Sequence, residues 1–316
     1  MKKGKKKIII ISGPTACGKT SVAIEVAKEL DGEIISADSM QVYRFLNIGT
    51  AKPDKDEIKE AKHHLIDIMN PDEIYSAGDF ANDADRIINK ISSKKKIPII
   101  CGGTGLYIKA LTKGLAAGLP ADKELKKEIH QSYLNKDLEI LYNELKEVDP
   151  ATAEKLSPSD KQRIKRALEV YYITGMPISK IHTKHSFSDE RYDYLYFCLK
   201  RDRNELRKRI EARVDKMIEK GLYDEAKSIY KKYKGKEINA FRAIGYREMI
   251  SHLKGEVSFD EAVKLIKKAT KAYAKRQMTW FKKQKEIIWI NIKDEDYEAP
   301  AKAIIERAKV FLKMKN

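Results

Sequence analysis

The chain has 316 residues, of which 42% are hydrophobic and 35% are charged, so it can form one large α/β domain and a smaller unit. No stretch has the length of a transmembrane helix, and the apolar run near the basic N-terminus is too short for a signal peptide, which predicts a cytoplasmic protein without a membrane partner. The formal net charge of +17 favours a polyanionic partner, although a lysine-rich composition does not establish RNA binding by itself.

The first predicted element is a buried strand over residues 7–12, and it leads into a glycine-rich loop. The loop reads G-x-x-x-x-G-K-T, and an amphipathic helix to about Leu30 follows it. This strand–loop–helix context is typical of a phosphate-binding P-loop. The loop residues are Gly13, Pro14, Thr15, Ala16, Cys17, Gly18, Lys19 and Thr20.

Four residues of this loop have a physical reason to bind phosphate. Gly13 and Gly18 let the backbone curl, so that successive N–H groups converge on phosphate oxygens at a helix N-terminus. Lys19 adds a full positive charge, and Thr20 offers a hydroxyl to Mg²⁺. The sequence therefore predicts a polyphosphate ligand with Mg²⁺, and it leaves open whether a nucleotide such as ATP binds.

Strands continue to alternate with helices after the P-loop. We expect a strand at residues 33–36, a helix near 77–92 and a strand at 97–101 that Gly102 and Gly103 end. This alternation predicts a P-loop NTPase-like parallel sheet flanked by helices, in the α/β class.

The pattern becomes wholly helical after Gly114. The clearest helix there has Ser157 as its expected N-cap, Pro158 at its first position and Asp160 three residues after the cap, and it ends near Gly175. Strand character returns over residues 192–199, a mostly helical tail follows, and a last strand is expected within 287–290. The predicted domains are a catalytic core of residues 1–115 and 191–316 and an inserted all-helical domain of residues 116–190.

Two polar residues follow strands of the predicted sheet. The strand at 97–101 ends without the Walker-B acid that helps to hold Mg²⁺ in many P-loop NTPases. The nearest carboxylate is Asp38, after the preceding strand, and Thr104 lies in a second glycine-rich turn. Both belong to the carboxyl edge, where doubly wound sheets bind ligands. Taken alone, Asp38 is also compatible with a cap or turn residue.

Basic segments supply candidates for contacts with anions. Arginines gather between Arg201 and Arg213, and Arg209 and Arg213 share one helical face. Solvated charge is the default interpretation, but a guanidinium near the sheet edge suits a diphosphate. The segments 162–166 and 242–247 suit an RNA backbone without being decisive.

Cysteine and histidine patterns point away from metal or disulfide chemistry. Cys17, Cys101 and Cys198 are widely separated and form no C-x-x-C pair. The pair His63 and His64 has no cysteine near it, which favours a hydrogen-bonding role. From these residues alone, the leading hypothesis is a P-loop kinase for a small metabolite. A non-enzymatic RNA-binding protein with a P-loop switch is the alternative.

Several longer motifs, in order along nearly the whole chain, resemble the bacterial tRNA dimethylallyltransferases. These enzymes modify the adenine beside the anticodon. The motifs are GPTACGKT at 13–20, DSMQVYR at 38–44, IGTAKP at 48–53, HHLID at 63–67, GGTGLY at 102–107, DKQRIKRALEVY at 160–171, RAIGYRE at 242–248 and KRQMTWF at 275–281.

The resemblance implies transfer of a dimethylallyl group from dimethylallyl diphosphate to N6 of the adenine at tRNA position 37, with release of diphosphate. It assigns the P-loop to the isoprenoid diphosphate and implies Mg²⁺ as cofactor. The inserted domain would grip the anticodon stem-loop, and no obligate protein partner is evident. The implied catalytic residues are Lys19, Asp38 as general base, Thr104 and Arg213.

The resemblance also implies a set of tRNA contacts. They are Asp38, Ser39, Met40, Gln41, Thr104, Lys126, Gln162, Arg163, Ile164, Lys165, Arg166, Arg242, Ala243, Ile244, Gly245, Tyr246 and Arg247. Lys126 stands where many relatives carry an arginine. This change keeps a phosphate contact but loses the bidentate geometry.

Overall fold

The computed structural model describes residues 5–114, 129, 132, 133, 136–184, 191–234 and 238–314, with the side chains of 182–184 excepted. It divides into two compact units, one formed by Met1–Thr112 with Glu190–Asn316 and the other by Lys113–Asp189. The boundaries expected from the sequence, 115/116 and 190/191, fall close to these.

A six-stranded sheet forms the centre of the first unit, and each neighbouring pair of strands is parallel. The strand order is β3-β2-β4-β1-β5-β6, so β1 with its P-loop lies centrally, between β4 and β5. The strands are β1 (Lys6–Ser12), β2 (Gly32–Ser36), β3 (His63–His64), β4 (Ile97–Gly102), β5 (Tyr192–Lys200) and β6 (Ile287–Asn291). The predicted fold class is confirmed.

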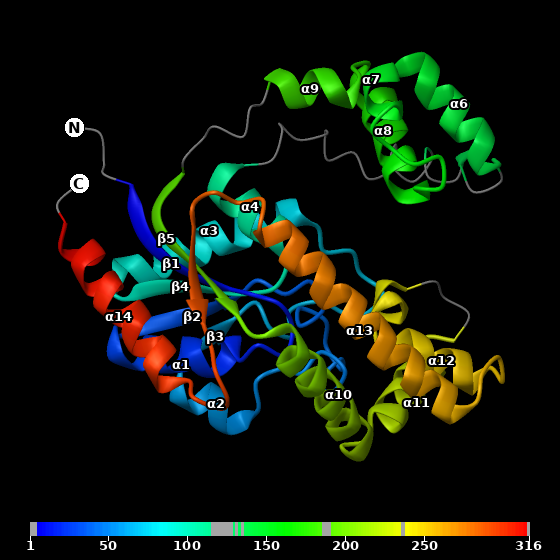
Figure 1. Cartoon of the computed structure of the whole chain (residues 1–316). Coiled ribbons are helices and arrows are strands. Elements are labelled where there is room, and N and C mark those ends of the chain that lie inside the picture. The colour runs from blue at the N-terminus through cyan, green and yellow to red at the C-terminus, as the bar shows by residue number, and fades with distance from the viewer. Residues whose placement is uncertain are drawn as a thin grey trace. The chain divides into compact units, whose positions relative to one another are not determined.

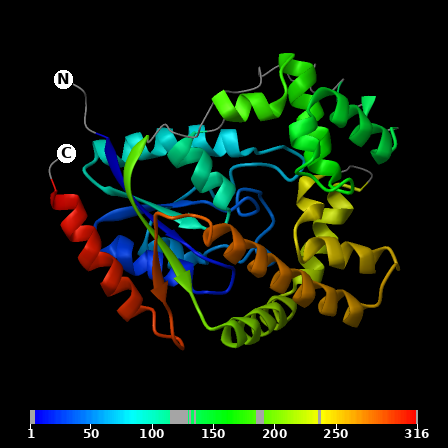
Figure 2. The same ribbon diagram turned by 45° about the horizontal axis from the view of Figure 1, so that its top comes forward.

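Helices cover both faces of the sheet, which explains why β1 is an unbroken run of isoleucines. Ile8 and Ile10 pack into one buried cluster with α3 (Ala77–Ser93) and α4 (Gly105–Lys113). Ile9 and Ile11 pack into the other cluster, with α1 (Lys19–Glu29) and α14 (Glu298–Lys313). Figures 1 and 2 show α14, in red, beside α1 on this second face.

The remaining helices of this unit follow β5, apart from the short α2 (Lys55–Glu60). The long helix α13 packs against α10 and α12, and α11 packs against α12 (Figure 1). Most of their buried apolar residues join the same hydrophobic cluster as α3 and α4, while Ile210 and Ala274 pack with Ala16. The bounds are α10 (Arg203–Glu219), α11 (Leu222–Lys232), η1 (Asn239–Arg242), α12 (Tyr246–Leu253) and α13 (Phe259–Phe281).

Every regular element among the described residues of the second unit is a helix, and the unit has a small core of its own. Leu141 and Leu145 pack against Ile164 and Leu168. The expected N-cap of the clearest helix is wrong by three residues: Ser157 begins a turn, and the Asp160 side chain accepts a hydrogen bond from Arg163 N. The helices are α6 (Leu138–Val148), α7 (Pro150–Ala153), α8 (Lys161–Thr174) and α9 (Ile178–Lys184).

Candidate active site

The carboxyl ends of four neighbouring strands bring the candidate site residues to one edge of the sheet. Ser12 at the end of β1 is in register with Gly102 of β4 and Cys198 of β5, and Ser36 of β2 is in register with Cys101. Parallel strands that end in register place their following loops side by side. The P-loop, the Asp38 segment, the turn with Thr104 and the start of α10 therefore meet at this edge.

Glycines in the P-loop occupy positions where a side chain would collide. Gly13 has φ +147°, and a Cβ there would lie 2.7 Å from the Leu199 carbonyl oxygen. Gly18 has φ +95° directly before α1, and a Cβ there would lie 2.3 Å from the Tyr297 ring. The loop is thus wound tightly against β5 and the segment before α14.

Two arginine side chains donate hydrogen bonds to backbone carbonyl groups of the P-loop. Arg209 Nε donates to Ala16 O at 3.1 Å, and Arg201 Nε donates to Cys17 O at 3.2 Å. Because a trans peptide directs its N–H opposite to its C=O, the amides of Cys17 and Gly18 point away from these arginines. The arginines therefore orient these loop amides toward the opposite side, an arrangement found in loops whose amides bind anions.

Lys19 and Arg213 make fewer contacts within the described protein than Arg201 and Arg209 do. Lys19 Nζ donates to Pro14 O at 2.9 Å. The half-buried Arg213 guanidinium makes no hydrogen bond or ion pair with another described residue, and burial lowers its pKa while the charge of Asp38 acts in the opposite direction. Arginine stays protonated in proteins. Arg213 therefore places near Asp38 a positive charge that is engaged in no hydrogen bond or ion pair with a described residue.

Asp38 has one oxygen engaged and the other open. Asp38 Oδ1 accepts hydrogen bonds from Met40 N at 2.8 Å and Gln41 N at 3.3 Å, which is the arrangement of a turn residue. Asp38 Oδ2 has no hydrogen-bond partner among the described residues. The two roles expected for Asp38 are therefore compatible, because the turn fixes the carboxylate and leaves an acceptor for a ligand.

Thr104 ties the second glycine-rich turn to the Asp38 segment. Its hydroxyl accepts from Ser39 N at 3.1 Å, and its own N–H donates to Ala37 O at 3.1 Å. A Cβ at Gly102 would lie 2.2 Å from that same Ala37 oxygen, so only glycine permits this close approach. Asp38 and Thr104 are consequently held as neighbours.

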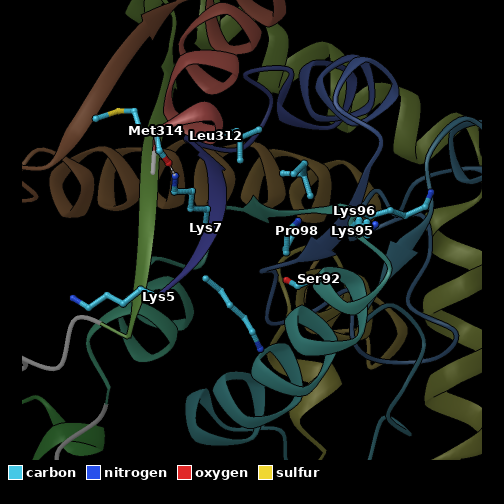
Figure 3. A pocket seen from close by; sticks show the side chains of 10 residues that line it. Lys5, Lys7, Ser92, Lys95, Lys96, Pro98, Leu312 and Met314 are labelled. Carbon is cyan, nitrogen blue, oxygen red and sulfur yellow. Dashed lines mark hydrogen bonds between the residues drawn. The ribbon is translucent and has the colours of Figure 1, made fainter. Parts of the chain in front are cut away.

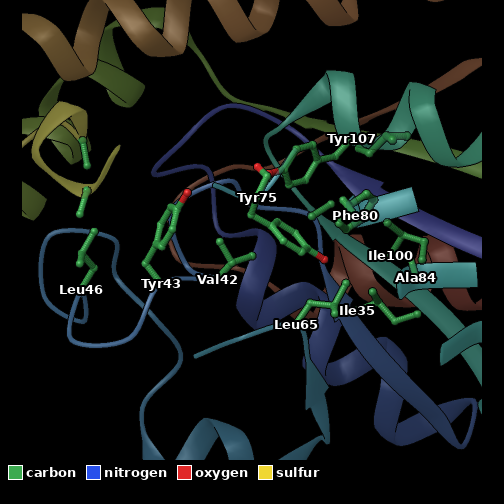
Figure 4. Close-up of a cluster of buried hydrophobic side chains, with 14 of the residues drawn as sticks. Ile35, Val42, Tyr43, Leu46, Leu65, Tyr75, Phe80, Ala84, Ile100 and Tyr107 are labelled. Atoms are coloured by element: carbon green, nitrogen blue, oxygen red, sulfur yellow. The ribbon is translucent and has the colours of Figure 1, made fainter. Parts of the chain in front are cut away.

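A cluster of buried aromatic and aliphatic side chains anchors the chain after Asp38 (Figure 4). Val42, Tyr43 and Leu46 are buried in it. Tyr107, from the helix after Thr104, stacks on Phe80 with ring centroids 4.5 Å apart. Both segments that carry the polar site residues thus enter one core, which restricts their movement.

The loop beyond this cluster is held by a carboxylate from α11. Glu225 accepts hydrogen bonds from three successive backbone amides, those of Asn47 at 3.1 Å, Ile48 at 2.9 Å and Gly49 at 3.4 Å. The Tyr246 hydroxyl donates to the same carboxylate at 2.6 Å and accepts from Gly49 N at 3.1 Å. The IGTAKP and RAIGYRE motifs are therefore parts of one hydrogen-bonded network.

Two polar side chains of α13, for which no role was predicted from the sequence, also reach the site. Gln277 is 6% exposed and hydrogen-bonds to both glycine-rich loops. The Tyr273 hydroxyl hydrogen-bonds with Thr104 and Gln277, while burial and then the charge of Asp38 raise its pKa. The available signal for Gln277 was the KRQMTWF motif at 275–281, which a long segment of sequence separates from the loops it contacts, and Tyr273 lies outside that motif.

Side chains that commonly ligate metal ions do not cluster within the described part of the chain. No group of three or more His, Cys, Asp or Glu residues there is arranged to hold a metal ion. His64 Nε2 lies 2.7 Å from Glu33 Oε2, and His63 Nδ1 lies 2.8 Å from Ala61 O, as expected of hydrogen-bonding histidines. Cys17, Cys101 and Cys198 are free, and burial raises the pKa of the Cys17 thiol.

Comparisons with known proteins decide which family this site belongs to. The family model described as IPP transferase matches residues 41–284. The tRNA dimethylallyltransferase 2 of Geotalea uraniireducens is 47% identical over 286 residues, which cover 90% of this chain and 92% of that protein. The tRNA dimethylallyltransferase of Acetivibrio thermocellus is 45% identical and covers 96% of this chain and 97% of its own length.

The chain belongs to the IPP transferase family. Among solved structures, the tRNA isopentenylpyrophosphate transferase from Bacillus halodurans has a TM-score of 0.73 at 36% identity, covering 98% of this chain and 97% of that one. A eukaryotic dimethylallyltransferase acting on tRNA has a TM-score of 0.85 at 28% identity, covering 98% of this chain and 80% of its own. The resemblance and the transferase class inferred from sequence motifs are confirmed.

The residues that family membership would assign to tRNA differ in their exposure. Gln162, Arg163 and Arg166 on α8 are exposed, whereas Ile164 is fully buried and Lys165 Nζ donates to Tyr133 O at 3.0 Å. The Ile164 side chain packs in the core of its unit and is therefore not available for a contact with RNA.

The second segment expected to contact RNA, residues 242–247, also contains both exposed and buried residues. Arg242 and Arg247 are exposed, Ile244 is half-buried, and Gly245 is buried. Ala243 and Tyr246 are 5% and 1% exposed, so their side chains stabilise the fold and do not face RNA.

The remaining residues expected to contact tRNA are those of the Asp38 segment and Lys126. Ser39 and Met40 are half-buried beside Asp38. The Gln41 amide is used internally, because it accepts from Ser36 Oγ and donates to Thr50 O and Ala51 O. Lys126 lies outside the described residues.

A concave feature lies away from the candidate site. A groove of about 450 Å³ opens at the amino ends of β1 and β4, at the edge of the sheet opposite the P-loop (Figure 3). Lys5, Lys6, Lys7, Lys95 and Lys96 line it together with Ser92, Ile97, Pro98, Leu312 and Met314. Separately, none of the described helices combines the length and the apolar character that crossing a membrane requires.

Proposed function

We propose that this member of the family transfers a dimethylallyl group from dimethylallyl diphosphate to N6 of the adenine at tRNA position 37. The N6–carbon bond forms, the carbon–oxygen bond to diphosphate breaks, and the N6 proton leaves to a base. The observation that supports this best is a carboxylate with one open oxygen, Asp38, at the sheet edge that also carries a P-loop. A P-loop without a Walker-B acid suits an intact diphosphate leaving group.

The P-loop would stabilise the departing diphosphate. Cys17 and Gly18 supply oriented amides, and Lys19 and Arg213 supply positive charge where negative charge grows. Such donors act most strongly when they are fixed before the reaction, and the contacts of Arg201 and Arg209 with the loop carbonyls supply that fixation.

The Thr20 side chain fits the expected Mg²⁺. It is half-buried in the first turn of α1, next to Lys19, and its hydroxyl makes no hydrogen bond to another described residue. Mg²⁺ takes one or two protein oxygens together with phosphate oxygens and water, so a single hydroxyl is a sufficient protein ligand. When bound there, Mg²⁺ would neutralise part of the diphosphate charge.

Asp38 Oδ2 would orient the adenine amine and accept its proton. An exocyclic adenine amine is a weak nucleophile, because its lone pair is delocalised into the ring. A carboxylate at the N–H offsets the positive charge that appears on nitrogen as the bond forms. Thr104, fixed beside Asp38 through Ser39 N, places a hydroxyl next to the reacting groups.

We assign RNA contacts to exposed basic and polar side chains. In the second unit these are Gln162, Arg163 and Arg166, and in the first unit Arg242 and Arg247. Guanidinium groups suit phosphate and stack on bases of a single-stranded loop. The target adenine must leave the anticodon-loop stack, at a cost of roughly a few kcal/mol.

The test is a transfer assay with a defined anticodon stem-loop, dimethylallyl diphosphate and Mg²⁺. We expect mass spectrometry of the digested RNA to show prenylated adenosine at position 37, and an RNA with guanosine at that position to stay unmodified. Calorimetry should show tighter binding of dimethylallyl diphosphate than of ATP. Absence of prenylated product together with selective ATP binding would instead favour a P-loop kinase.

A further inference from the structure

A single buried amide joins the two glycine-rich loops of the site. Gln277 Oε1 accepts a hydrogen bond from Thr15 N of the P-loop at 2.9 Å. Its Nε2 donates to Gly103 O of the second loop, also at 2.9 Å. The side chain is 6% exposed, so both ends of the amide are satisfied within the protein. We call this pair of hydrogen bonds the Gln277 bridge.

The bridge requires an unusually close approach of side chain and backbone. A Cβ at Gly103 would lie 2.2 Å from Gln277 Nε2, so a side chain at that position would displace the amide. Gln277 itself belongs to α13, a helix of 23 residues that packs against α10 and α12. The side chain that forms the bridge therefore comes from a helix that is restrained by its packing and does not move easily with either loop.

From Gly103 the connection continues to Asp38. The next residue, Thr104, accepts from Ser39 N and donates to Ala37 O, which brackets Asp38 in the chain. Tyr273 lies one helical turn before Gln277, and its hydroxyl hydrogen-bonds with both Gln277 and Thr104. A continuous series of hydrogen bonds thus runs from the P-loop, through α13, to the Asp38 segment.

This connection matters because the two loops hold different reaction partners in the proposed transfer. The P-loop holds the diphosphate, and through it the carbon that is attacked, while Asp38 and Thr104 hold the amine. The distance between amine and carbon is then set by the distance between the two loops. A misplacement of about 1 Å between reacting groups can cost about 10²-fold in rate.

We propose that Gln277 is a positioning residue for the prenyl transfer. It fixes the P-loop relative to Asp38, and by occupying Thr15 N it leaves the later loop amides to the diphosphate. This inference rests on the proposed function and adds to it a residue that touches neither substrate. It states that loss of the bridge lowers the rate of the chemical step more than it lowers the affinity for either substrate.

The first experiment replaces Gln277 by methionine, which keeps the length and volume of the side chain but neither hydrogen bond. The matched control is Gln284→Met, since Gln284 also lies near the end of α13 but donates only to Trp280 O. For Gln277→Met we expect a single-turnover transfer rate about 10–10² times lower than for the wild type. We expect less than about threefold change in KM for the stem-loop and in the affinity for inorganic pyrophosphate with Mg²⁺. Gln284→Met should keep the wild-type rate.

The second experiment uses Gln277→Glu, in which the pH determines whether the hydrogen bond to Gly103 O can form. When ionised, the carboxylate introduced by this substitution would still accept from Thr15 N, but it would face Gly103 O with an acceptor. A protonated carboxyl group can donate to that oxygen again. The transfer rate of Gln277→Glu, divided by the wild-type rate at each pH, should therefore rise as pH falls. Division by the wild-type rate at each pH removes the pH dependence that the two proteins share.

The outcomes separate this inference from the proposed function. If the wild type does not prenylate the stem-loop, the proposed function is wrong. If the wild type does so and folded Gln277→Met transfers as fast as Gln284→Met, Gln277 is not a positioning residue. If Gln277→Met does not fold, the ratio for Gln277→Glu decides, and a ratio that does not change with pH overturns the inference.

Discussion

The carboxyl edge and the amino edge of the central sheet both carry many cationic side chains, but these side chains make different contacts at the two edges. At the carboxyl edge, Arg201 and Arg209 are bonded to P-loop carbonyls, and the Arg201 side chain is 0% exposed. At the amino edge, lysines surround an open groove (Figure 3). Of these lysines, Lys6 and Lys95 are exposed.

The lysines at the amino edge that do make contacts hold the ends of elements together. Lys7 Nζ donates to Phe311 O near the end of α14, and Lys96 pairs with Asp31 at 2.8 Å. The number of charges therefore does not distinguish the two edges. What distinguishes the candidate site is that buried contacts fix the direction of its donors before a ligand arrives. Changes at the two edges should accordingly have very different effects.

The largest effect is expected for Lys19→Ala. This change removes the flexible cation of the P-loop, whose proposed partner is the diphosphate, so turnover should fall by more than about 10³-fold. The affinity for tRNA, measured by filter binding, should stay close to that of the wild type. An equally large loss of tRNA affinity would show that Lys19 does not act on the diphosphate alone.

A smaller effect is expected for Glu225→Ala, which removes the acceptor of three backbone amides. Unsatisfied amides should lower the free energy of unfolding by about 1–3 kcal/mol, measured by urea denaturation. The neighbouring Asp224→Ala, on the exposed side of α11, is the matched control and should change stability by less than about 0.5 kcal/mol. Equal stability of the two variants would contradict the role given to the Glu225 network.

The Arg163→Ala variant tests whether the second unit contacts tRNA. The Arg163 side chain is 74% exposed, with only a weak pairing to Asp160 at 3.5 Å, so loss of fold stability should be small. If Arg163 contacts one phosphate, the plot of log affinity for tRNA against log salt should become less steep by about one unit. Lys155→Ala, also exposed in this unit, serves as the control, and an unchanged slope for Arg163→Ala would remove it from the RNA interface.

The smallest effect is expected at the amino edge. In the double variant Lys6→Ala and Lys95→Ala, two exposed lysines of the groove are lost. Because no buried contact orients them, the transfer rate on the stem-loop should stay within about twofold of the wild type. A tenfold loss would mean that the two edges are not as different as the structure indicates.

The sequence predicted those parts of the fold that rest on local patterns. The isoleucine run of β1, the P-loop and the helical stripe of α3 follow from periodicity and glycine placement. The two-residue strand β3 is too short for any periodic pattern to indicate it. The N-cap of α8 was misplaced because Ser157-Pro158 and Asp160 each satisfy a capping rule, and only the hydrogen bond from Arg163 N selects Asp160.

The candidate site was predictable for residues in motifs and less so for their partners. Lys19, Asp38 and Thr104 follow strand ends, so topology alone brings them together. The bridge by Gln277 links residues that lie far apart in the sequence, and the KRQMTWF motif that contains Gln277 does not indicate which residues it contacts. Gln41 and Tyr246 stand in motifs expected to contact tRNA, yet their polar atoms are used within the protein.

The most direct test of the central claim is the single-turnover rate of Asp38→Asn on a preformed complex with dimethylallyl diphosphate and the stem-loop. Asparagine keeps the shape of the side chain, and its amide oxygen can still accept from Met40 N, but it cannot take the amine proton. We predict a rate about 10²–10⁴ times lower than that of the wild type, with far smaller changes in the affinity for either substrate. Transfer at a near wild-type rate would contradict the account and leave Asp38 as a turn residue that only binds.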